Sequence, residues 1–220
     1  MTPGRSSRQA WEPRARPRGS RPLRLPARRH AGYTLVELVV VVGLVCAVLT
    51  AAVPAFDAAA DAAEASGAAR YLSGVVARAR LEAARSQRTV AVRFSRHVPV
   101  TFTVVIDGDG DGVRADDVAA GVDRTMRDAD RLEDHFPRVR FGISGPVSGI
   151  DEARGLTAAD DPVRFGAADQ VTLTPLGTAT GGTAYLTSRA GVQFAVRVSG
   201  VTGRARVLRY DHGRATWRPL

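Results

Sequence analysis

The most specific local motif in the sequence is a run of aspartates that alternate with single glycines. Its members are Asp107, Asp109 and Asp111. Carboxylates at the first, third and fifth positions, with glycine at the sixth, are typical of the calcium loop of an EF-hand. The twelfth position, where such a loop has Glu, is Val118, and Asp116 and Asp117 just before it are the candidate replacements. The spacing therefore indicates oxygen ligands for a calcium ion.

A second interpretation of the same loop needs no metal. Asp-Gly pairs favour tight turns, so residues 107–112 are also typical of a solvated acidic turn between two strands. Neighbouring carboxylates repel one another unless a cation neutralises them. Both interpretations stay open, and calcium is the one cofactor that the sequence suggests.

Arginines near the C-terminus form a second candidate site. They are Arg197, Arg204, Arg206 and Arg209. Apolar and polar residues alternate over residues 192–198, which predicts a strand with one buried face. A four-residue connection over residues 199–202 would place Arg197 opposite Arg204, with Arg206 on the same outward face and Arg209 on the other. Like charges opposite each other on paired strands are unfavourable, and a bound polyanion reverses that cost.

Two kinds of partner fit these arginines. Residues 107–169 hold 15 acidic residues and eight Arg, whereas residues 189–220 hold seven Arg and one Asp. The first interpretation is that these two regions of the chain neutralise each other. The second is that the arginines bind an acidic partner or DNA, with strong salt dependence and little sequence preference.

A third candidate is a carboxylate at the start of a long apolar run. Glu37 precedes residues 38–56, which carry no charge and include Thr50 as their one polar side chain. As a helix these 19 residues span roughly 28 Å, close to the thickness of a bilayer core. A charge at the mouth of a membrane helix is costly and is usually functional, although it can also reach the aqueous interface.

The segment before the apolar run is strongly basic. Residues 1–32 hold nine Arg and one Glu, so nearly all of the formal net charge of +9 lies there. Positive residues on one flank favour a cytoplasmic N-terminus and a domain on the other side of the membrane. A cleaved secretory signal and a simple one-span anchor are two interpretations of this arrangement.

A third interpretation comes from a resemblance to the leader of type IV prepilins and type II secretion pseudopilins. The matching residues are Gly32, Tyr33, Thr34, Leu35 and Glu37, followed by the apolar run. Pro54, the twenty-second residue after Gly32, falls where that family often has a helix-bending proline. The resemblance implies cleavage between Gly32 and Tyr33 by the prepilin peptidase and N-methylation of Tyr33. It also implies that Glu37 pairs with the N-terminal amine of a neighbouring subunit and so fixes the axial register.

The remaining residues indicate the elements that position these groups. Alanine-rich residues 57–88 predict an amphipathic helix with Leu72, Val75 or Val76, Ala79 and Ala83 on one face. Period-two patterns then predict strands over residues 89–95, 100–106, 138–143, 170–174, 183–187, 192–198 and 204–210. Residues 182–186, 194–198 and 202–207 resemble the GspH/FimT group of minor pilin-like proteins.

We therefore expect an α+β fold of the pilin type. A long bent helix, with a membrane half over residues 33–56 and an amphipathic half over residues 57–88, packs on a mostly antiparallel β-sheet domain over residues 89–220. Residues 1–32 are the leader that is removed. The expected product is a minor pilin or pseudopilin of the inner membrane with a periplasmic domain, later part of a pilus or pseudopilus with other pilins.

No catalytic constellation is recognisable in the sequence. The four His residues are scattered, and no HExxH, GxSxG or phosphate-binding GxxxxGK motif occurs. The absence of Lys excludes Schiff-base chemistry, and a single cysteine, Cys46, excludes a disulfide framework and a cysteine zinc site. We expect no enzyme activity and no catalytic residues. A single-span protein with a periplasmic hydrolase domain is the remote alternative.

Overall fold

The computed structural model describes residues 32–95, 97–151 and 154–220. Except for Gly32, the predicted leader lies outside these residues. The chain divides into two compact units, residues 1–45 and 46–220, and the division falls inside the first helix.

The first helix, α1 (Leu35–Ser86), is 52 residues long. It begins with a local cap, because the backbone N–H of Glu37 donates to Oγ1 of Thr34 at 3.1 Å. Residues 32–50 are all exposed. The apolar part of α1 is long and hydrophobic enough to cross a membrane. A single helix that can span a membrane is therefore a feature of the described part of this chain.

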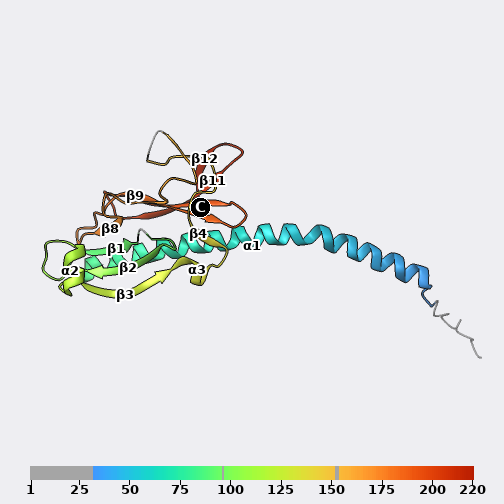
Figure 1. Ribbon diagram of the computed structural model, residues 1–220, viewed down its shortest axis with the longest axis horizontal. Coiled ribbons are helices and arrows are strands. Elements are labelled where there is room, and N and C mark those ends of the chain that lie inside the picture. The colour runs from blue at the N-terminus through green and yellow to red at the C-terminus, as the bar shows by residue number, and fades with distance from the viewer. Residues whose placement is uncertain (1–31, 96, 152–153) are drawn as a thin grey trace, which may run out of the picture. The chain divides into compact units, whose positions relative to one another are not determined.

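The C-terminal part of α1 packs on antiparallel sheets (Figure 1). The predicted face is confirmed, because Leu72, Val75, Val76, Ala79 and Ala83 are all buried. Three fully buried alanines precede them: Ala65, Ala68 and Ala69. Small side chains allow a helix to approach a sheet closely, so this part of α1 is a core element of the second unit.

Four of the strands form one sheet in the order β3-β2-β1-β8. They are β1 (Val90–Phe94), β2 (Thr101–Ile106), β3 (Arg124–Arg131) and β8 (Gln170–Leu173). Two short helices flank β3, namely α2 (Ala115–Ala120) and α3 (Leu132–His135). All of the strand pairs are antiparallel.

The second sheet has the order β12-β11-β10-β9-β4, and β7 also pairs with β9. Its strands are β4 (Val139–Phe141), β7 (Val163–Arg164), β9 (Gly182–Ser188), β10 (Gln193–Val198), β11 (Ala205–Asp211) and β12 (Thr216–Pro219). A small hairpin pairs β5 (Val147–Ser148) with β6 (Gly155–Leu156). One core, made by α1 and both large sheets, contains Phe94, Phe102, Phe141 and Phe165. The α+β class is therefore confirmed.

Candidate functional site

The predicted cleavage site lies just before α1. Gly32 and Tyr33 are exposed and not helical, and Tyr33 is 84% exposed. Glu37 is in the first turn of α1, three residues after Thr34, which caps it. This spacing is that of a capping box, a local role that the sequence analysis did not assign to Glu37. Pro54 lies inside α1, where it removes one backbone hydrogen bond.

The aspartate loop is built as an acidic turn around one buried carboxylate. Asp107 is 2% exposed, and its two oxygens accept hydrogen bonds from the backbone N–H groups of Gly110 at 2.7 Å and Gly112 at 3.0 Å. Both glycines have positive φ, near +98° and +96°, a conformation that glycine adopts without strain. One oxygen from each of Asp107, Asp109 and Asp111 lies within 4.8 Å of the others.

The two exposed carboxylates of this loop, Asp109 and Asp111, have pKa values that are shifted in opposite directions. The hydrogen bond from the backbone N–H of Asp111 lowers the pKa of Asp109. Partial desolvation and the hydrogen bond shared with Asp109 raise the pKa of Asp111, and the ion pair with Arg114 acts in the opposite direction. Opposite shifts are expected where two carboxylates compete for the same proton.

The residues predicted to complete a calcium loop are outside the cluster of three carboxylates. Asp116 and Asp117 are in the first turn of α2, and the carboxylate cluster found among the described residues does not include them. Val118 packs on a small core made by Ala91, Val105 and Val113. Asp123, which the sequence analysis missed, closes the loop instead, because it accepts from the N–H groups of Gly108 and Arg114. Calcium binding stays a prediction that rests on three carboxylates.

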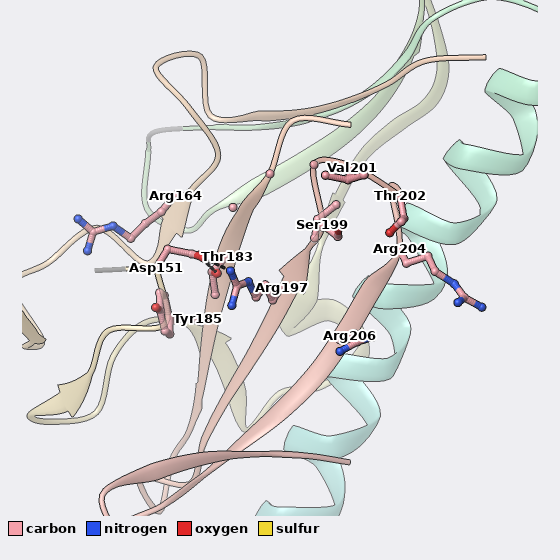
Figure 2. A pocket seen from close by; sticks show the side chains of 14 residues that line it. Asp151, Arg164, Thr183, Tyr185, Arg197, Ser199, Val201, Thr202, Arg204 and Arg206 are labelled. Carbon is pink, nitrogen blue, oxygen red and sulfur yellow. Dashed lines mark hydrogen bonds and ion pairs between the residues drawn. The ribbon is translucent and has the colours of Figure 1, made fainter. Parts of the chain in front are cut away.

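The C-terminal arginines line a cavity of about 810 Å³ that we call the basic pocket. The charged side chains that line it, together with one threonine, are Asp151, Arg164, Thr183, Arg197, Arg204 and Arg206. Figure 2 shows Arg197 directed toward Asp151 and Thr183, with Arg164 and Arg204 at the two ends. Arg209 lies outside the basic pocket, beside Tyr210 and His212, as expected for the opposite face of the strand.

The predicted register of this hairpin is wrong by two residues. Arg197 pairs with Arg206, and Val198 pairs with Ala205. The connection runs over residues 199–204, because Ser199 donates its N–H to the carbonyl of Arg204 at 3.0 Å. Gly203 adopts a φ of +60° in this turn. Arg204 therefore lies in the turn, while Arg197 and Arg206 face each other on the strands.

Pairing across four strands aligns the basic pocket. Arg164 on β7 is opposite Thr183 on β9, which is opposite Arg197 on β10, which is opposite Arg206 on β11. Residues that face each other on paired strands project from the same side of a sheet. Arg164 was not found from the sequence, because β7 is only two residues long and gives no alternating pattern. Thr183 lies in a predicted strand but was given no role, and Asp151 lies in the connection between β5 and β6, which no pattern marks.

Histidines do not gather into one site in the described part of the chain. His135 belongs to a cluster that joins α1, β3 and α3, where Asp130 accepts a hydrogen bond from Tyr71 at 2.5 Å and contacts Nε2 of His135 at 2.9 Å. Arg127 donates to the Tyr71 hydroxyl and forms an ion pair with Asp130. Since these groups satisfy one another, the cluster acts as a structural link between elements.

Comparison of the chain with protein-family models, with curated proteins and with solved structures found no match.

Proposed function

We propose that this chain is a minor pilin or pseudopilin, a structural subunit of a type II secretion pseudopilus or a type IV pilus. The observation that carries the proposal is the two-part character of α1. Residues 32–50 are exposed and almost wholly apolar, whereas Leu72, Val76 and Ala83 are buried under the sheets. A helix that is apolar on all sides needs lipid or a bundle of similar helices around it.

The proposed cycle uses both environments in turn. The chain inserts in the inner membrane with its basic N-terminus in the cytoplasm and its sheets in the periplasm. The prepilin peptidase cuts after Gly32 and the amine of Tyr33 is methylated. The apolar part of α1 then leaves lipid and packs against the helices of other pilins. There the carboxylate of Glu37 needs an opposite charge, and the terminal amine of a neighbouring subunit supplies it.

Mass spectrometry of the protein isolated from membranes tests this proposal. We expect a mature chain that begins at methylated Tyr33. A Gly32→Ala variant that stays unprocessed is the matched control, because Gly32 is exposed and makes no packing contact. A parent chain that keeps residues 1–32, or that begins near residue 50, would show that the proposal is wrong.

A second candidate function is polyanion binding by the basic pocket, with DNA as the partner. It is favoured by the placement of Arg197 and Arg206 directly opposite each other on β10 and β11. Both are exposed, and each phosphate that they neutralise would release counterions. In a titration of duplex DNA, Arg206→Gln should weaken binding, whereas Arg209→Gln removes the same charge from the opposite face and should change it little. Equal effects of the two variants would contradict a site in the basic pocket.

A further inference from the structure

The basic pocket contains one carboxylate in the middle of its arginines. Oδ1 of Asp151 lies 2.6 Å from Nη2 of Arg197, and Oδ2 accepts a hydrogen bond from the hydroxyl of Thr183 at 2.6 Å. Asp151 comes from the connection between β5 and β6, outside the sheet that it touches. Its two oxygens therefore contact Arg197 and Thr183, which face each other on β10 and β9 (Figure 2).

This arrangement leaves the positive charge of Arg197 and Arg206 only partly neutralised. Arg197 and Arg206 face each other on paired strands, which is unfavourable for two cations. Among the described residues, the ion pair of Asp151 is with Arg197, and Arg206 has no acidic partner. The carboxylate thus neutralises Arg197 and leaves Arg206 without an ion pair within the described part of the chain, and a larger anion could contact both arginines.

We propose that Arg197, Thr183 and Arg206 form an oxyanion site and that Asp151 occupies the part made by Arg197 and Thr183 as an internal competitor. The ligand class is a phosphodiester, whose two non-bridging oxygens take the hydrogen bonds of Arg197 and Thr183 that the two oxygens of Asp151 now take. The Asp151 side chain then turns into solvent. This inference rests on the second candidate function, since it names the regulation of the same pocket.

An anion must displace Asp151 in order to bind, and this requirement determines which anions the site accepts. A single small anion replaces one charge-assisted hydrogen bond with another and gains little. A polymer of phosphates gains further contacts at Arg206 and Arg204 in the same event, so it can displace the carboxylate. The side chains of Arg197 and Asp151 are 47% and 39% exposed, and exposed ion pairs are worth little. The competitor is therefore weak enough to be displaced.

The test compares Asp151→Asn with Asp128→Asn. Both remove one negative charge, and Asp128 is exposed on β3 in the other large sheet. The amide introduced by Asp151→Asn keeps an oxygen that can accept from Thr183, so the fold is expected to persist. The chain without residues 1–32, in a non-ionic detergent, is titrated separately with inorganic phosphate and with duplex DNA, and all variants are compared in this form.

We expect Asp151→Asn to bind both probes about two- to fivefold more tightly than the parent. Asp128→Asn should behave like the parent, and adding Arg197→Gln to Asp151→Asn should abolish the gain. A gain for phosphate without DNA binding by any variant would retain the oxyanion site and overturn the DNA function. No gain for either probe in Asp151→Asn, while the parent binds DNA, would overturn the competitor and retain the DNA function. No gain and no DNA binding would overturn both.

Discussion

Glu37 has a local position at the start of α1 and a separate intermolecular role in the proposed filament. Its N–H is held by Thr34, and its carboxylate is in the first turn of α1, where the helix dipole favours a negative charge. In the proposed filament the same carboxylate would pair with the terminal amine of a neighbour. The two roles differ in chemistry, because a capping box accepts either Glu or Gln, whereas an ion pair requires the charge.

Substitution of Glu37 separates these roles. Glu37→Gln should keep the start of α1 and should still be inserted and cut after Gly32, yet co-purification with partner pilins should fall as far as it does in Glu37→Ala. Pull-down of partner pilins, with the mature mass measured in parallel, checks this. If Glu37→Gln co-purifies like the parent and only Glu37→Ala fails, the side chain acts through the helix start and its charge is not needed.

The aspartate loop gives a second prediction at the scale of single residues. If Asp107, Asp109 and Asp111 converge on calcium, millimolar calcium should raise the thermal midpoint by mass action. Each kcal/mol of binding should add about 2–4 °C for a domain of this size. Magnesium should do much less, because it requires a smaller octahedral site. Asp109→Asn should remove the effect, and calcium scans of both proteins decide between a metal site and a solvated turn.

A charged cluster ties α1 to the second sheet at the level of elements. Arg138, just before β4, lies 3.1 Å from Asp61, 3.4 Å from Asp57 and 3.6 Å from Glu64, all on α1. The second oxygen of Asp61 accepts from the N–H of Ala190 in the turn between β9 and β10. Asp61 is 4% exposed, whereas the Asp57 side chain is 67% exposed. One buried carboxylate therefore links the helix to two parts of the sheet.

Asp61 and Asp57 form a matched pair for a stability experiment. Asp61→Ala should lower the free energy of unfolding by about 1–3 kcal/mol, because it leaves the N–H of Ala190 without its acceptor and removes the one buried carboxylate that pairs with Arg138. Asp57→Ala removes an exposed partner and should change stability by less than about 0.5 kcal/mol. Urea unfolding of the two variants measures both values. Equal losses would mean that the cluster acts through net charge.

Acid should weaken the link made by Asp130. Burial alone would raise the pKa of Asp130, but hydrogen bonds from Tyr71 and His135 and the charge of Arg127 hold it below its ordinary value of 3.8. A lowered pKa means that this carboxylate stabilises the fold above about pH 4 and that its contribution is lost as the pH falls through the folded value. Arg154 and Thr157 similarly lower the pKa of Asp160 to about 2.

Unfolding measured from pH 6 to pH 2 should therefore show a loss of stability below about pH 4. Asp130→Asn should make this loss shallower, because one of the groups that must be protonated is gone. Asp128→Asn, an exposed change on the same strand, should leave the acid profile of the parent unchanged. An identical profile for Asp130→Asn would rule out a contribution from this carboxylate.

At the scale of the whole molecule, the apolar patterns were sufficient to place the main elements. Each of the seven predicted strands is present, and the buried face of α1 lies where its spacing put it. The strand β3 was missed because its residues are mostly charged and exposed, with no period-two pattern. The pairing of Arg197 with Arg206 was missed because the length of a glycine-containing turn sets the register, and residue spacing does not fix that length.

The distribution of charge also belongs to this scale. Residues 1–32 hold nine Arg and one Glu, whereas residues 33–220 hold 22 Arg and 21 acidic residues. Removal of the leader would thus turn a strongly basic chain into a nearly neutral one. Any attraction of the processed chain for a polyanion must then come from local placement of arginines, of which the basic pocket is the best candidate among the described residues.

Salt titration of DNA binding, before and after removal of residues 1–32, separates the contribution of the leader from that of the basic pocket. Each phosphate neutralised on duplex DNA contributes about −0.9 to the slope of log K against log salt. Three contacts by Arg197, Arg204 and Arg206 predict a slope of about −2.7 for the processed chain. The unprocessed chain should have a much steeper slope.

Changing Arg197 and Arg206 together to Gln should reduce the slope of the processed chain by about 1.8, while the unprocessed chain still binds through its leader. Equal slopes for the two forms would exclude the leader as a DNA contact, and a processed chain that does not bind at low salt would exclude the basic pocket.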